Sequence, residues 1–267
     1  MTEITAVLCG NPNVGKSTVF NALTGLHQHT GNWTGKTVAT AAGVCRGVCR
    51  LVDLPGTYSL HAHSAEEEVA RDFLVGDDAA GVVVVCDATC LTRGVGLVLQ
   101  IIETGHRVAV CVNLLDDAER RGLSLDLPLL QRRLGVPVVG VSARHKKTLT
   151  PLRDAMAELV VCDTPPSGAA VAYPTPIENE IQRRLPYIAE SKVSRRYAAL
   201  RQMEAEDGEL SDPIATAVAD TAERLCRGVV RQEDGTPDAR DRRIDKILTS
   251  RRWGYPLMVL MLMGVLW

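Results

Sequence analysis

The sequence has no excess of charge of either sign. Its 30 lysines and arginines stand against 32 acidic residues, which gives a net charge of -2 over 267 residues. Proteins that hold nucleic acid by its phosphates usually carry a marked basic surplus, so this balance indicates no nucleic-acid partner. Hydrophobic residues make up 46% of the chain and charged residues 23%, which excludes disorder over most of its length.

A secretory signal is also absent from the opening residues, MTEITAVLC, which have neither a basic flank nor enough apolar length. We therefore expect the N-terminus to stay in the cytoplasm and the eight cysteines to be reduced thiols. Because 267 residues exceed the size of one compact domain, the length predicts a main domain with smaller pieces attached.

The first part of the chain alternates apolar runs with longer amphipathic stretches. This pattern predicts an α/β fold with a doubly wound, mostly parallel sheet. Two β-like segments between Thr37 and Asp53 predict an antiparallel hairpin at one edge. The apolar runs that we expect to form the buried strands are 4–9, 81–87, 107–113 and 137–142.

The pattern divides the chain into four parts. We expect a P-loop nucleotide-binding domain at 1–162, a linker rich in proline and glycine at 163–176, and a small all-α domain at 177–250. The last segment, 251–267, holds fifteen uncharged residues after two arginines, which predicts the truncated start of a transmembrane helix. A short buried helix is the alternative for that segment.

The strongest motif is GNPNVGKS at 10–17, which matches the GxxxxGK[ST] phosphate loop between a strand and a helix. The two glycines of this pattern let backbone N–H groups surround phosphates, and Lys16 supplies a positive charge. Ser17 is positioned to bind Mg²⁺. The predicted phosphate-binding residues are Gly10, Asn11, Pro12, Asn13, Val14, Gly15, Lys16, Ser17 and Thr18.

A second element, DLPG at 53–56, ends a hydrophobic strand. Its carboxylate, Asp53, would support Mg²⁺, and the N–H of Gly56 would contact the γ-phosphate. Thr37 is the candidate threonine that closes over Mg²⁺, although a threonine that merely starts a strand is the alternative. Many GTPases carry a glutamine after this glycine, whereas Thr57 stands here, so we expect slow hydrolysis.

Base recognition is predicted at Asn113, Leu114 and Asp116, at the end of another apolar run. One carboxylate can accept two hydrogen bonds from the N1 and N2 edge of guanine, which adenine lacks, so Asp116 predicts preference for GTP. Leu114 replaces the lysine common in this motif and predicts modest affinity. Residues 142–144, which are Ser142, Ala143 and Arg144, would complete the pocket.

These motifs resemble the N-terminal region of the FeoB family, the bacterial ferrous iron transporters. The resemblance is carried by GNPNVGKSTVFNALTG, GNWTGKTV, DLPGTYSL, DATCLTRGVGLVLQIIETG and VNLLDDAERRG. It implies a cytoplasmic GTPase that serves as a nucleotide switch for Fe²⁺ uptake at the bacterial inner membrane. It also implies a helical domain likened to a nucleotide-dissociation inhibitor, a C-terminal membrane domain, and small cytoplasmic accessory proteins of the iron-uptake system as partners.

The family further implies hydrolysis stimulated by K⁺. By resemblance, Asn13 would hold the ion, the carbonyl groups of Gly31 and Trp33 would complete its site, and Thr37 would bind Mg²⁺. The catalytic residues are then Asn13, Lys16, Thr37 and Gly56. Thr34 and Lys36 depart from the family pattern, and the second positive charge at Lys36 bears on how strong the K⁺ effect is.

Two other classes share the phosphate-loop asparagine or the hydrophobic C-terminal segment. One is a soluble K⁺-dependent GTPase of ribosome assembly or tRNA modification, which the balanced charge disfavours. The other is a stand-alone membrane-anchored G protein, in which the chain would stop soon after Trp267.

Overall fold

The computed structural model places most of the chain, from the first strand of the sheet to a short strand that follows the last of the helices named below. The described residues are 5–25, 28–32, 39–45, 47–60, 65–76, 79–162 and 168–232, together with 250 and 263.

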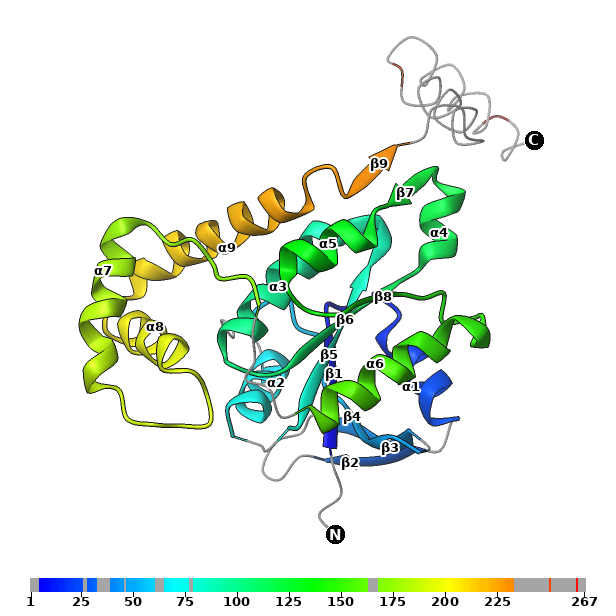
Figure 1. The fold of residues 1–267 in the computed structure, drawn as a ribbon, viewed down its shortest axis with the longest axis horizontal. Coiled ribbons are helices and arrows are strands. Elements are labelled where there is room, and N and C mark those ends of the chain that lie inside the picture. Colours follow the sequence, from blue (N-terminus) through cyan, green and yellow to red (C-terminus); the bar gives the residue numbers. More distant parts are fainter. Residues whose placement is uncertain are drawn as a thin grey trace.

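A seven-stranded sheet forms the centre of the molecule, in the order β2-β3-β4-β1-β5-β6-β8 (Figure 1). Strand β1 runs parallel to both β4 and β5, and β6 is parallel to β5 and β8, whereas β2, β3 and β4 are antiparallel neighbours. The predicted doubly wound, mostly parallel sheet is confirmed. The strands are β1 (Thr5–Gly10), β2 (Gln28–Asn32), β3 (Ala39–Cys45), β4 (Cys49–Asp53), β5 (Gly81–Asp87), β6 (Val108–Asn113) and β8 (Val138–Gly140).

Helices cover both faces of the sheet because successive strand residues point to opposite sides. In β5, Val82 and Val84 belong to a core shared with α2, α3 and α5, while Val83 and Val85 belong to a second core with α1 and α6. All four valines are fully buried. The helices of this part are α1 (Lys16–Thr24), α2 (Ala65–Gly76), α3 (Leu91–Glu103), α4 (Leu115–Arg120), α5 (Leu127–Leu134) and α6 (Thr150–Val161).

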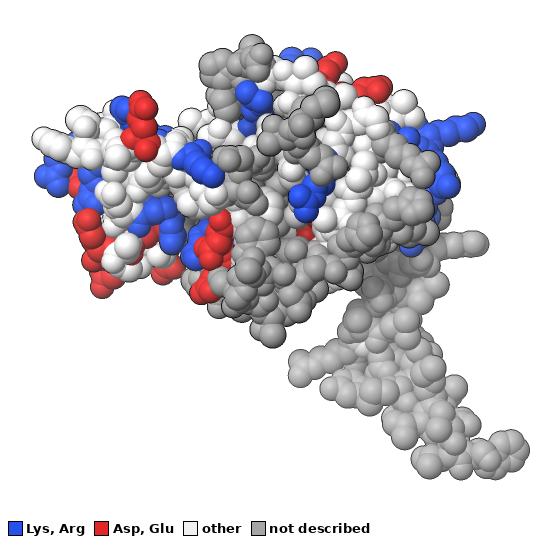
Figure 2. Space-filling view, turned by 90° about the horizontal axis from the view of Figure 1, so that it is seen from below, with Lys and Arg blue, Asp and Glu red and all other residues white. Residues whose placement is uncertain are grey.

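The C-terminal third contributes three further helices, α7 (Thr175–Arg184), α8 (Arg195–Glu206) and α9 (Ser211–Cys226). Helix α9 lies beside α3 and α5, and α7 and α8 lie together at the left of the view (Figure 1). We call these three helices the helical part. Their buried residues, including Tyr197 and Ile214, join the same hydrophobic cluster as α3, and Val171 and Tyr173 of the preceding segment are buried with them. The helical part therefore shares its core with the sheet domain. Acidic and basic side chains alternate over its surface (Figure 2).

Two details differ from the sequence prediction. We expected no β-structure after residue 177, but β9 (Val230–Gln232) pairs antiparallel with the equally short β7 (Leu123–Leu125). We expected the β3–β4 hairpin to form the edge of the sheet, but β2 adds one more strand outside it. β9 is short and depends on a partner that is distant in sequence, so it leaves little periodicity. β2, with the sequence QHTGN, has no apolar run that would mark it as a strand.

The predicted membrane segment lies outside the described residues apart from Met263. None of the helices that can be described is both long enough and apolar enough to cross a bilayer.

Candidate nucleotide site

The phosphate loop joins β1 to α1 and runs close to two neighbouring segments. A side-chain carbon at Gly10 would lie 2.5 Å from the carbonyl oxygen of Val85, and one at Gly15 would lie 2.5 Å from Nδ2 of Asn113. Gly15 also has a φ of 78°, a left-handed conformation that glycine adopts without strain. These contacts explain why both positions of the motif carry glycine here.

The loop encloses a pocket of about 270 Å³ at the N-terminus of α1. Asn13 is exposed and has a φ of 66°, whereas Asn11 is buried and its Oδ1 has no hydrogen-bond partner among the described residues. The positive end of the helix dipole and the lysine favour an anionic ligand in this pocket. The lining residues are Asn11, Pro12, Asn13, Gly15, Lys16, Ser17, Thr18 and Gly56.

Lys16 and Asp53 form an ion pair at the N-terminus of α1, and each side chain is only 10% exposed. Burial raises the pKa of the Asp53 carboxyl, while the positive charge of Lys16 and a hydrogen bond from Ser17 act in the opposite direction. The structure thus brings together the three side chains that the sequence assigned to phosphate and Mg²⁺.

The DLPG segment lies directly against the phosphate loop. The N–H of Thr57 donates to the carbonyl oxygen of Gly10 at 3.1 Å, and a side-chain carbon at Gly56 would lie 3.1 Å from Cγ of Pro12. The hydroxyl of Thr57 donates to the carbonyl oxygen of Ser59 at 2.6 Å, and this threonine is fully buried. Its hydroxyl is therefore engaged within the protein rather than turned toward the phosphate pocket.

The predicted base-side residues meet the phosphate loop through Asn113, which is 1% exposed. Its Nδ2 donates to the carbonyl oxygen of Val14 at 3.0 Å, and its Oδ1 accepts from the N–H of Ala143 at 3.1 Å. One side chain therefore ties together three segments that are far apart in the sequence.

Asp116 and Ser142 are also neighbours, because the backbone N–H of Asp116 donates to Oγ of Ser142 at 3.1 Å. Leu114 adopts a left-handed φ of 64° at the start of α4. The Asp116 carboxylate is 27% exposed and lies 3.7 Å from the guanidinium of Arg120, while Arg144 is exposed. This carboxylate is thus accessible for a ligand that presents hydrogen-bond donors.

Two predicted site residues, Trp33 and Thr37, lie outside the described residues, and so do the divergent Thr34 and Lys36. Gly31 lies in β2, where it pairs with Thr40 of β3.

Sequence reasoning missed two residues that hold the segment after DLPG. Oε1 of Gln100, on α3, accepts from the N–H of Leu60 at 2.7 Å, and Oε1 of Glu67, on α2, accepts from the N–H of Tyr58 at 3.2 Å. Gln100 lies in a segment that resembles the family, DATCLTRGVGLVLQIIETG, but no motif gives either residue this role. The contacts depend on how the helices pack, so the sequence carries no local signal for them.

The strand, the glycine-rich loop and the helix that follows it define a P-loop domain on a doubly wound sheet. The chain belongs to the ferrous iron transport protein B family, because a sequence model of the N-terminal region of that family matches residues 4–156.

Curated relatives of the chain carry the description Fe(2+) transporter FeoB. The chain is 32% identical to the Salmonella typhimurium protein over 289 residues, which cover 97% of this chain and 37% of that protein. It is 40% identical to the Staphylococcus aureus N315 protein over 141 residues, which cover 52% of this chain and 21% of that protein. The chain therefore spans only a minor part of the relatives' length.

Solved structures of the same family share the fold. The cytosolic domain of the T. maritima FeoB iron transporter in its GMPPNP form matches with a TM-score of 0.78 and 30% identity, over 86% of this chain and all of that chain. The GDP form II of that domain matches with a TM-score of 0.77 and 30% identity, over 85% of this chain and 99% of the other.

Proposed function

We propose that this chain is the GTP-binding and GTP-hydrolysing part of a ferrous iron transporter. The observation that carries the proposal is the convergence of Lys16, Asp53 and Ser17 beside Gly56, in the positions that a nucleoside triphosphate and Mg²⁺ require. The T. maritima relative, characterised in GDP and GMPPNP forms, supports the choice of guanine nucleotides.

Guanine selectivity rests on Asp116, whose carboxylate is accessible at the side of the site formed by Asn113 and Ala143. We expect GTP and GDP to bind more tightly than ATP in titration calorimetry. Asp116→Asn should weaken GTP binding by about 1–3 kcal/mol, since an amide cannot accept both hydrogen bonds from guanine.

Asp117→Asn is the matched control for this experiment. Asp117 is also 27% exposed, is the next residue of the same helix, and pairs with Arg120 and Arg121. GTP binding that is unchanged in Asp116→Asn, or weakened equally in both variants, would contradict the assignment of the base site.

The donor groups at the phosphate loop suit Mg²⁺, because the hydroxyl of Ser17 and the carboxylate of Asp53 are hard oxygen ligands. Such an ion would neutralise phosphate charge and orient the γ-phosphate. Thr37 is the further residue assigned to Mg²⁺. For K⁺, the exposed side chain of Asn13 and the backbone of Gly31 offer oxygen ligands, and Trp33 is assigned by resemblance.

The engaged hydroxyl of Thr57 supports slow intrinsic hydrolysis, because it leaves no side chain at that position to orient water. We expect phosphate release to be faster in KCl than in NaCl at equal ionic strength, and Asn13→Ala to abolish the difference. Equal rates in both salts would contradict the K⁺ proposal while leaving nucleotide binding intact.

Fe²⁺ transport, a location on the cytoplasmic face of the bacterial inner membrane, and contacts with a membrane domain and accessory proteins are proposals taken from the family. The test is radioactive iron uptake in bacteria that lack their own ferrous transporter and express the full-length gene. Lys16→Ala should abolish uptake, with membrane levels of the protein checked by blotting. Full uptake by this variant would show that iron transport does not depend on the nucleotide site.

A further inference from the structure

The segment that follows DLPG is tied to α3 by one buried side chain. Gln100 is 8% exposed, and its Oε1 accepts two hydrogen bonds, one from the N–H of Leu60 at 2.7 Å and one from Oγ of Ser59 at 3.0 Å. Leu60 is itself 1% exposed. Residues 57–60 therefore cannot shift along α3 without breaking both bonds and exposing a buried amide.

The helical part is also attached to α3, at Glu103, less than one helical turn after Gln100. The carboxylate of Glu103 accepts from the hydroxyl of Tyr173 and from Nε of Arg196, the latter at 3.0 Å. The N–H of Ser194 donates to the carbonyl oxygen of Thr104 at 2.7 Å. Because residues three apart lie on one face of a helix, Gln100 and Glu103 bring the two attachments together.

The two attachments also meet in space. One small enclosed cavity is lined from both sides. Its lining includes Leu60, Gln100 and Glu103, together with Tyr197 of α8 and Tyr173 of the segment before α7. The segment after DLPG is thus in the same packed cluster as the helical part, with α3 as their common support.

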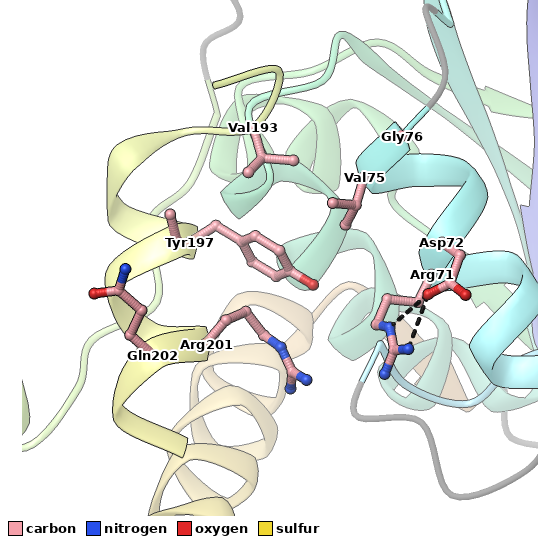
Figure 3. A pocket seen from close by; sticks show the side chains of 9 residues that line it. Arg71, Asp72, Val75, Gly76, Val193, Tyr197, Arg201 and Gln202 are labelled. Carbon is pink, nitrogen blue, oxygen red and sulfur yellow. Dashed lines mark hydrogen bonds and ion pairs between the residues drawn. The ribbon is translucent and has the colours of Figure 1, made fainter. Parts of the chain in front are cut away.

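The alternative route between the two parts, from α2 to α8, is looser. A groove of about 520 Å³ separates these helices, with Val75 on one wall and Val193 on the other (Figure 3). The ring of Tyr197 lies across the groove, and Arg71 pairs with its own neighbour, Asp72. A hydrogen bond does cross between the two parts, from Nζ of the exposed Lys192, before α8, to the carbonyl oxygen of Gly76 at the end of α2, at 2.9 Å. The bonds of residues 59–60 to α3 are buried, so we expect a shift of residues 57–60 to act more directly on α3 than a shift of α2 acts on α8.

We propose that Gln100 is a positioning residue that couples the nucleotide site to the helical part. It holds residues 57–60 in the position that places Gly56 beside the phosphate loop, and through α3 and Glu103 it makes the helical part respond to the bound nucleotide. The inference rests on the proposed function, in which Gly56 contacts the γ-phosphate.

The test replaces the side chain of Gln100 with one that cannot accept hydrogen bonds. Gln100→Met removes both bonds at similar volume. We expect Gln100→Met to lower kcat for GTP about tenfold, as the loss of one to two net hydrogen bonds implies, with KM changed much less.

Gln131→Met is the matched control, because Oε1 of Gln131 likewise accepts a backbone N–H, that of Val138 at 3.0 Å, at the other edge of the sheet. It should leave kcat and KM unchanged. Ser59→Ala removes only one of the two bonds at a partly exposed position, and it should give a smaller loss of kcat if Gln100→Met fails to fold.

The coupling itself is measured by hydrogen exchange of α8 amides in GDP and in a non-hydrolysable GTP analogue. The wild-type protein should show a difference between the two states that Gln100→Met and Ser59→Ala reduce and Gln131→Met retains. An α8 response that survives in both Ser59→Ala and Gln100→Met, or no response in the wild type, would overturn the coupling. Failure of the proposed function is distinct, since the wild-type protein would then bind no guanine nucleotide at all.

Discussion

The side-chain amide of Asn113 donates to the carbonyl oxygen of Val14 across 3.0 Å, and so connects the end of β6 to the phosphate loop. The same side chain accepts from the N–H of Ala143. Because Asn113 is buried, these bonds are shielded from water, and losing one leaves an unsatisfied polar group. The asparagine of the base motif therefore also acts as a structural link between the predicted phosphate and base sites.

Asn113→Asp tests this link at constant shape. The acceptor for Ala143 remains, but the donor to Val14 is replaced by a carboxylate oxygen that repels the carbonyl. We expect a loss of about 1–3 kcal/mol in the free energy of unfolding and weaker GDP binding. Urea unfolding and calorimetry measure both, with the exposed Asn179→Asp as control. Equal stability of the two variants would show that the link to Val14 contributes little.

Alanine substitutions at Gly15 and Gly47 can distinguish two costs of an added side chain: a steric clash with a neighbouring residue, and strain of a backbone with positive φ. Their φ values are 78° and 77°, but a side-chain carbon at Gly47 would have no atom within 4 Å, whereas one at Gly15 would meet Asn113. We expect Gly47→Ala to cost about 1 kcal/mol through strain alone. Gly15→Ala should cost clearly more and should abolish GDP binding. Similar costs for the two variants would contradict the close approach of Asn113.

The parts of the fold that the sequence predicted are those with local signals. The uninterrupted apolar run that became β5 needs no partner to be recognised, since a strand buried on both faces has no polar alternation. The phosphate loop at 10–17 is likewise visible because its glycines, its lysine and its place between strand and helix follow from chemistry within eight residues.

The parts that could not be predicted depend on pairs that are distant in sequence. Three residues of β9 form a strand only because β7 lies beside them. Gln100 looks like any polar residue within an apolar helix until residues 59–60 are packed against it. The left-handed backbone conformation of Leu114, just before α4, could not be predicted, because leucine rarely adopts it.

His106 predicts a specific dependence of stability on pH. Burial lowers the pKa of its imidazole, and Nδ1 lies 2.7 Å from Oγ1 of the fully buried Thr104. Since the pKa is lower in the folded state, the unfolded chain takes up this proton first as the pH falls below about 6.5, and stability is lost on acidification.

The measurement for His106 is the midpoint of thermal unfolding from pH 7.5 to pH 5.5. His106→Gln should show a smaller decrease over this range than the wild-type protein, even if it is about 1 kcal/mol less stable at pH 7.5. His145→Gln, at an exposed position, should keep the wild-type slope. A slope that is unchanged in His106→Gln would show that this imidazole is not the source of the dependence.

Arg196 and Arg195 are adjacent residues whose ion pairs differ in burial. Arg196 contacts Glu103, whose side chain is 8% exposed, and also pairs with both carboxylate oxygens of Glu178 at 2.7 Å. Arg195 pairs with Glu190, whose side chain is 89% exposed. Removing a cation from a buried carboxylate costs about 3–5 kcal/mol, whereas breaking an exposed pair costs about 0–1 kcal/mol.

We therefore expect Arg196→Met to destabilise the protein by about 3 kcal/mol in urea unfolding, and Arg195→Met by less than about 1 kcal/mol. The reason is that Glu103 would keep only the hydroxyl of Tyr173 as a described hydrogen-bond donor to its carboxylate. The double variant Arg196→Met with Glu103→Gln should recover part of the loss, because an amide tolerates burial without a cation. If no recovery occurs, the cost of Arg196→Met arises from its bonds to Glu178 or its contact with the Tyr173 ring, and not from the attachment of the helical part to α3.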